Sequence, residues 1–126
     1  MLNVTLQPNY GIAIFEMDGQ LSSSDFDHAA HKIDPYLEQV SGFKGGVVCV
    51  ANWPLWDSSN AFFAHLQFIH AHHRYFEKVA VVSNSLSFKL FAPIYGASIY
   101  SQVKCFSIDG LEQSKRWILA DDNFEN

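Results

Sequence analysis

Two short apolar runs decide the fold: Gly-Gly-Val-Val-Cys-Val-Ala at residues 45–51 and Lys-Val-Ala-Val-Val-Ser at residues 78–83. Neither run alternates strictly between apolar and polar residues, and this pattern is typical of strands that are covered on both faces. Such strands belong to parallel sheets whose connecting helices lie on the two faces. The two runs therefore predict buried strands of an α/β sheet.

The segments around these two strands complete the order of elements. Residues 2–6 and 12–17 predict an N-terminal β-hairpin, because the turn-forming residues 8–11 separate them. Residues 103–108 alternate enough to be an edge strand. Helices are expected at about residues 22–40, 58–76, 84–95 and 111–119. The prediction is a mixed, mostly parallel sheet of about five strands with about four helices, in the order ββαβαβαβα.

The first two expected helices each carry one apolar stripe. The stripe of the first comprises Phe26, Ala30, Ile33, Leu37 and Val40. Pro35 interrupts that helix, so we expect a kink or two abutting helices there. The stripe of the second comprises Phe62, Leu66, Ile69, His73 and Phe76. These stripes are the expected contact surfaces with the sheet.

Composition limits the classes of function. A length of 126 residues predicts one domain over the whole chain, with residues 121–126 as a frayed tail. The net charge is −5 and the eight basic residues are not clustered, which argues against nucleic acid as a partner. Aromatic residues make up 15% of the chain, so we expect a bulky core or an apolar pocket.

The sequence also predicts a cytoplasmic protein. The N-terminus has no basic segment followed by a long apolar one, and no run approaches the ~20 apolar residues of a membrane span. Cys49 and Cys105 lie in strand-like runs and are expected to be buried free thiols of a reducing compartment.

Histidines are the chemically notable residues. His65, His70, His72 and His73 fall on one expected helix. Only His70 and His73 are spaced to share one edge of a metal site, and no further ligand completes it, so we predict no metal and no cofactor. No nucleophile motif is present either, so no catalytic residue is predicted and the protein is not expected to be an enzyme. His73 interrupts its apolar stripe, either as a satisfied core histidine or as a polar anchor in a ligand pocket.

The candidate binding region is the loop at residues 52–56 with the helix start that follows. Trp53 and Trp56 flank an apolar loop next to Asp57 and Ser58. This loop follows a buried strand, at the sheet edge where open α/β folds place their ligands. Alternatively, the two indole rings fold back over the helix ends and cap the core.

The element order and several short motifs resemble the STAS domain of the anti-sigma-factor antagonists, and within that superfamily the SpoIIAA-like group of bacterial proteins, related to the Sec14 lipid-binding fold. The resemblance covers nearly the whole chain. The matching segments are Asp-Gly-Gln-Leu at residues 18–21, Asp-Pro-Tyr-Leu at 34–37, the strand at 47–50 with Trp-Asp-Ser-Ser-Asn at 56–60, Val-Ala-Val-Val at 79–82, and Trp117.

Asp57-Ser58-Ser59 is similar to the Asp-Ser-Ser-Gly of the antagonists, in which a kinase phosphorylates the serine after the aspartate. The resemblance implies Ser58 as a phosphorylation site, and a phosphate there would meet the positive end of a helix. The chain departs from the motif at Asn60, where that family has glycine, and in its two loop tryptophans. An ordinary helix cap is the more common role of a serine in this pattern, and Ser58 can serve as one without being phosphorylated.

Two functions remain open. The first is a non-catalytic regulatory module that binds a protein partner at the corner formed by residues 53–59. The second, which the Sec14 relationship implies, is a carrier or sensor of a small apolar, lipid-like ligand held between the helices and the sheet. A homodimer is also left open. The candidate binding residues are Trp53, Trp56, Asp57, Ser58, Phe62, His73 and Phe88, and the expected pocket is lined by Phe62, Phe63, Leu66, Phe88, Phe91 and Tyr95.

Overall fold

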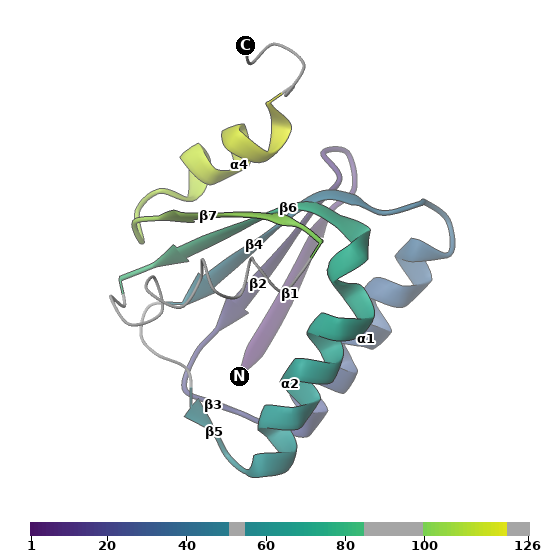
Figure 1. Ribbon diagram of the computed structural model, residues 1–126, viewed down its shortest axis with the longest axis vertical. Coiled ribbons are helices and arrows are strands. Elements are labelled where there is room, and N and C mark those ends of the chain that lie inside the picture. The colour runs from purple at the N-terminus through teal and green to yellow at the C-terminus, as the bar shows by residue number, and fades with distance from the viewer. Residues whose placement is uncertain (51–54, 85–99, 121–126) are drawn as a thin grey trace.

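The computed structural model describes residues 1–50, 55–84 and 100–120. Its main sheet has five strands in the order β1-β2-β4-β6-β7 (Figure 1). The strands are β1 (Leu2–Gln7), β2 (Ile12–Met17), β4 (Phe43–Val50), β6 (Phe76–Ser83) and β7 (Gln102–Phe106). β1 is antiparallel to β2, and all the other pairs are parallel. The predicted hairpin and the mostly parallel five-stranded sheet are confirmed.

Helices lie on both faces of this sheet (Figure 1). α1 (Ser23–Leu37) and α2 (Ser59–His72) pack side by side on one face, and α2 continues into the short 3-10 helix η1 (His73–Tyr75). α4 (Leu111–Leu119) covers the other face over β4 and β6. The helix expected at residues 84–95 falls outside the described residues except for Asn84. None of the described helices has the length and apolarity needed to cross a membrane.

The two faces of the sheet form separate core clusters. On the α1 and α2 face the buried residues are Val4, Ala13, Phe15, Ala29, Ile33, Phe43 and Phe76. On the α4 face they are Ile12, Ile14, Val47, Ala80, Val82 and Ile118. β2, β4 and β6 contribute to both clusters. This explains why β4 from residue 45 to 50 and β6 from residue 79 to 82 are apolar without alternation. The apolar runs in the sequence are therefore explained as expected, because both faces of these strands are covered.

Pro35 does not break α1. The helix runs without interruption to Leu37, so the proline lies in its last turn and the chain leaves the helix two residues later. α1 is therefore one helix rather than the two abutting helices that were one expectation, and the expected stripe ends early. The buried residues of α1 are Phe26, Ala29 and Ile33.

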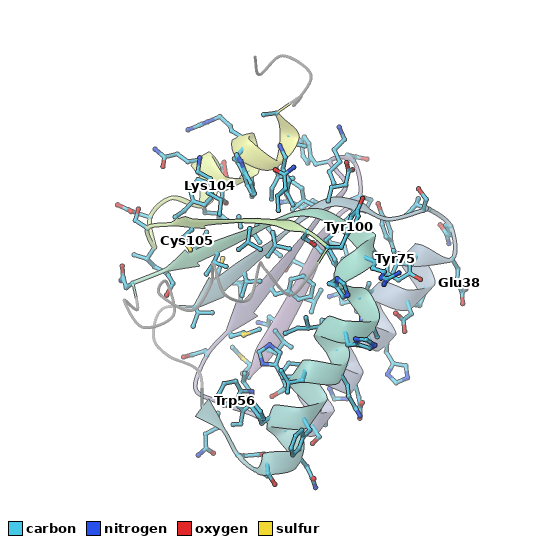
Figure 2. The ribbon with its side chains drawn as sticks, in the orientation of Figure 1. Glu38, Trp56, Tyr75, Tyr100, Lys104 and Cys105 are labelled. Carbon is cyan, nitrogen blue, oxygen red and sulfur yellow. The ribbon has the colours of Figure 1, made fainter. Side chains whose placement is uncertain are left out.

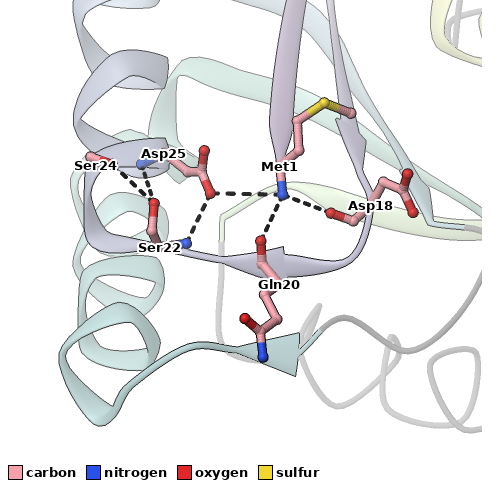
Figure 3. Close-up of polar contacts among 6 residues, drawn as sticks. All are labelled: Met1, Asp18, Gln20, Ser22, Ser24 and Asp25. Carbon is pink, nitrogen blue, oxygen red and sulfur yellow. Dashed lines mark hydrogen bonds and ion pairs between the residues drawn. The ribbon is translucent and has the colours of Figure 1, made fainter.

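The N-terminus of α1 is fixed by a capping box (Figure 3). The backbone N–H of Asp25 donates to Ser22 Oγ over 3.2 Å, and the Ser22 N–H donates to the Asp25 carboxylate over 2.8 Å. The N-terminal ammonium of Met1 donates to the carbonyl oxygens of Asp18 and Gln20 and lies 3.8 Å from the same carboxylate. These contacts tie the start of β1 to the connection between β2 and α1.

A second, two-stranded parallel sheet joins the starts of α1 and α2. It consists of β3 (Gln20–Leu21) and β5 (Leu55–Trp56), which lie together at the lower end of the view in Figure 1. The Asp57 N–H donates to the Leu21 carbonyl and extends the pairing by one bond. Two-residue strands have no periodicity that a sequence could display, and these two were not predicted. They determine where Trp56 lies relative to both helices.

Candidate functional site

α2 buries a stripe that differs from the predicted one over its first two turns. The inward stripe consists of Ala61, His65, Phe68 and His72. Phe62, Phe63 and Leu66 instead expose 40%, 58% and 39% of their surfaces. The prediction was wrong for Phe62 and Leu66, because α2 is rotated about its axis by about one residue relative to the predicted orientation. Two imidazoles therefore face the sheet where phenylalanine and leucine were expected.

His65 is held inside by two aromatic side chains. The Trp56 indole N–H donates to His65 Nδ1 over 3.2 Å, and the Phe26 ring stacks on the imidazole with centroids 4.8 Å apart. Figure 2 shows Trp56 turned toward α2. Burial lowers the pKa of His65 from 6.5 to about 4. The ring is therefore neutral at physiological pH, as an acceptor of the indole N–H must be.

His72 links the two helices on this face. Its Nδ1 lies 2.8 Å from the Phe68 carbonyl oxygen, and its Nε2 lies 2.8 Å from an Asp34 carboxylate oxygen on α1. Both neighbouring atoms are acceptors, so both contacts require a ring N–H to donate. Because Asp34 is largely exposed, solvent screens this pair and it contributes little to stability. Its structural effect is to hold α1 and α2 in register.

His73 lies at the end of α2, where η1 begins. The backbone N–H of Tyr100 donates to His73 Nδ1 over 2.9 Å. Desolvation, with smaller contributions from Arg74 and His70, lowers the pKa of His73. Since Nδ1 accepts, the neutral ring carries its proton on Nε2. His73 thus has a protein partner at Nδ1, and it also lines the apolar cavity described next.

An apolar cavity of about 120 Å³ lies between α2 and the sheet. Eleven of its fifteen described lining residues are apolar, and three are the histidines just described. The lining residues are Leu2, Phe15, Met17, Phe26, Gly46, Val48, His65, Phe68, Ile69, His72, His73, Phe76, Val79, Val81 and Val103. Few voids larger than one water molecule occur in a packed domain, so a hollow of this volume is a candidate ligand site.

The predicted site residues separate into three groups. His73 lines the cavity. Trp56 is half-buried through its contact with His65, which supports the capping alternative for that ring, whereas Asp57, Ser58 and Phe62 are exposed at the start of α2. Trp53, Phe88, Phe91 and Tyr95 lie outside the described residues.

The expected pocket and the observed cavity occupy the same layer but differ in lining. Phe62, Phe63 and Leu66 do not line the cavity. His65, His72 and the strand residues Val48 and Val81 line the cavity but were not among the predicted site residues. Only the 4-3-4 spacing of residues 61, 65, 68 and 72 could have indicated the inward stripe, and a more apolar stripe beside it has the same spacing.

Metal-ligating side chains and thiols are also present in the parts of the chain that the structure describes. There, no three histidine, cysteine or acidic side chains converge in a way that could hold a metal ion. Cys49 and Cys105 are thiols outside any disulfide, but both are half-buried rather than fully buried as expected. Desolvation, assisted by Glu16, raises the pKa of Cys49 above its usual value. A raised pKa leaves less of the reactive thiolate at neutral pH.

The sequence profile of the SpoIIAA-like family matches residues 12–119 of this chain. The chain belongs to the SpoIIAA-like family. A crystal structure of an uncharacterised protein of the DUF3478 family from Shewanella loihica PV-4, which has a SpoIIAA-like fold, superposes with a TM-score of 0.71. The two sequences are 14% identical, and the alignment covers 94% of this chain and 92% of the other. No curated protein matches the sequence.

These comparisons confirm the family and the fold that the sequence resemblance implied. At 14% identity the similarity to the Shewanella protein concerns the fold alone. What this SpoIIAA-like domain binds has to be argued from its own residues.

Proposed function

We propose that this SpoIIAA-like domain is a non-catalytic binding module that holds a small apolar molecule, or the end of an acyl chain, in the cavity between α2 and the sheet. The observation that carries the proposal is the cavity itself, with its apolar lining and its volume of about 120 Å³. An engineered apolar cavity of about 150 Å³ stays dry and binds benzene or xenon. The volume therefore suits a single ring or a few methylene groups.

The three histidines fit this function as fixed polar groups at an apolar site. His65 and His72 are both engaged with protein partners, so neither needs a ligand to satisfy its hydrogen bonds. The cavity then selects mainly by shape and apolarity. The cavity is too small to enclose a whole diacyl lipid. Only the end of one acyl chain would enter it.

Native mass spectrometry of the purified protein tests the proposal. We expect a co-purifying apolar molecule whose extraction with organic solvent lowers the unfolding temperature, because a ligand that binds only the folded state stabilises it. Adding benzene to the extracted protein should raise the unfolding temperature again. A protein that carries no ligand, loses no stability on extraction and does not respond to benzene would contradict the proposal.

Recognition of a protein partner is the second candidate function, and the exposed side chains at the start of α2 favour it. Phe62 and Phe63 are exposed and contact each other edge to face with centroids 5.8 Å apart. Beside them Ser58 caps the helix, accepting the Ala61 N–H over 3.1 Å. A phosphate on Ser58 would add roughly −1.5 to −2 charge beside this apolar pair, at the positive end of α2. That combination suits a partner interface that phosphorylation controls.

Substitution Phe63→Ser tests the partner interface. Because Phe63 is 58% exposed, we expect a change in unfolding free energy of less than about 0.5 kcal/mol. We expect the affinity for a partner captured from the native cells to fall about tenfold or more, as at an aromatic hot spot. The matched control is Gln67→Ser, another exposed position of α2. Equal partner affinities for Phe63→Ser and Gln67→Ser, with Ser58 unmodified in the same cells, would exclude this second function.

A further inference from the structure

A second hollow lies at the opposite end of the sheet from Trp56 and Ser58. Its lining residues precede or open the parallel strands, so they belong to the amino ends of β2, β4, β6 and β7. They are Pro8, Asn9, Tyr10, Gly11, Ser41, Gly42, Phe43, Lys44, Arg74, Tyr75, Glu77 and Tyr100, and we call this hollow the amino-end groove. Figure 2 shows Tyr75 and Tyr100 at the end of α2 that is farther from Trp56. Neither candidate function above uses this groove.

The groove differs from the apolar cavity in size and in chemistry. Its volume is about 490 Å³, against about 120 Å³ for the cavity. The volume of the groove lies within the range of roughly 300–1,000 Å³ that is usual for binding sites of small molecules. Its described lining combines phenol, ammonium, guanidinium, hydroxyl and carboxylate groups. Such a surface is suited to a polar partner.

Exposed tyrosines gather at this groove. Tyr10, Tyr75 and Tyr100 expose 57%, 43% and 68% of their surfaces. They come from three separate connections, and the fourth described tyrosine, Tyr36, instead stacks on Phe43 in the core. Tyrosine and arginine are enriched at protein–protein interfaces and among the residues that contribute most to binding. The composition of the groove is therefore that of an interface.

The charges of the groove favour an acidic partner. Lys44 and Arg74 are exposed, and Glu77 is the acidic side chain of the described lining. The described lining of the groove therefore has a formal charge of +1, whereas the whole chain has a net charge of −5. A local excess of cations on an acidic protein steers acidic partners to that place.

Close backbone contacts hold the walls of the groove in place. The Lys44 N–H donates to the Gly11 carbonyl over 2.8 Å, which joins the β1–β2 turn to the start of β4. A Cβ atom at Gly42 would lie 2.9 Å from the Tyr75 carbonyl oxygen, so the loop before β4 rests directly on η1. Because these contacts hold the groove in one conformation, binding of a partner costs little conformational entropy.

We propose that the amino-end groove binds an acidic, extended segment of a partner protein. Lys44 and Arg74 would pair with carboxylates of the segment, and the three tyrosines would pack against its backbone and apolar side chains. Binding in the groove does not depend on a ligand in the apolar cavity, because the described linings of the two hollows have no residue in common.

Chemical-shift mapping of the ¹⁵N-labelled full chain tests the inference. The probe is an acetylated decapeptide of alternating glutamate and alanine, titrated into the millimolar range, with the lysine–alanine peptide and inorganic phosphate at equal ionic strength as comparisons. We expect the acidic peptide to shift amide signals around Tyr10, Lys44, Arg74, Tyr75 and Tyr100, and added salt to weaken it. The double substitution Lys44→Glu with Arg74→Glu should lower its affinity about fivefold or more.

The matched control is Lys104→Glu with Arg116→Glu. It makes the same change of charge at exposed residues of β7 and α4 that do not line the groove, and it should keep most of the affinity. Three outcomes would overturn the inference. They are no groove shifts with the acidic peptide, an equal loss in both double variants, or equal shifts with phosphate or the lysine peptide.

Discussion

Val48→Trp should abolish binding of benzene to the extracted protein, with an affinity loss of about 100-fold or more. Val48 lines the apolar cavity from β4 and is only partly buried against the core of that face. An indole at this position would occupy much of a volume of about 120 Å³. A ligand that fits this cavity would then have no space left, whereas a ligand bound elsewhere would be unaffected.

The measurement is the rise in unfolding temperature on adding benzene. In the native protein the rise should follow the benzene concentration, and in Val48→Trp it should vanish. Because the new ring fills an existing void, the unfolding free energy of the ligand-free variant should change by less than about 1.5 kcal/mol. Val40→Trp is the matched control, since Val40 is 39% exposed and lies outside the cavity lining. A benzene response that persists in Val48→Trp would contradict the assignment of the cavity as the site.

The sheet could be predicted from sequence because its signals are local. The central runs are apolar on both sides over residues 45–50 and 79–82, and both sides are in fact covered. The helix at residues 111–119 also has the bounds that were predicted. The short strands β3 and β5 escaped prediction, because a two-residue strand is specified only by the segment with which it pairs.

The rotation of α2 could not be predicted, for a physical reason. Two stripes with the same spacing lie side by side on this helix, and hydropathy favours the one with Phe62 and Leu66 over the one with His65 and His72. The histidines face inward because Trp56 and Asp34 supply their hydrogen-bond partners. Asp34 comes from a position 38 residues away. A histidine on an apolar face can be judged buried only when such partners are known.

The candidate site was therefore only partly predictable. The layer between the helices and the sheet was expected to hold a ligand, and His73 was among the residues proposed for it. The strand residues of the lining were missed, because an apolar residue that borders a cavity has no sequence feature that separates it from one that fills the core. The amino-end groove was missed for a similar reason. Tyr10, Tyr75 and Tyr100 come from three connections that only the sheet brings together.

His65 should make the stability of the protein depend on pH between about 6.5 and 4. Burial lowers its pKa in the folded state from 6.5 to about 4. Between these values the unfolded chain binds a proton that the folded protein does not bind, so the free energy of unfolding falls as the pH falls. The contribution of His65 is fully present above pH 6.5. It is lost progressively toward pH 4 and amounts to about 3 kcal/mol.

Urea unfolding of His65→Gln at stepped pH isolates this contribution. Glutamine cannot take up the proton, but its amide oxygen can still accept the Trp56 N–H, so the folded arrangement around the indole is largely kept. The variant should be less stable than the native protein at pH 7, because the stacking on Phe26 is lost, and the two curves should converge as the pH falls. His70→Gln, at an exposed position of the same helix, should leave the pH dependence close to that of the native protein. Parallel curves for the native protein and His65→Gln would show that the imidazole is not held in its neutral form, and the hydrogen bond from the Trp56 indole to His65 Nδ1 would have to be abandoned.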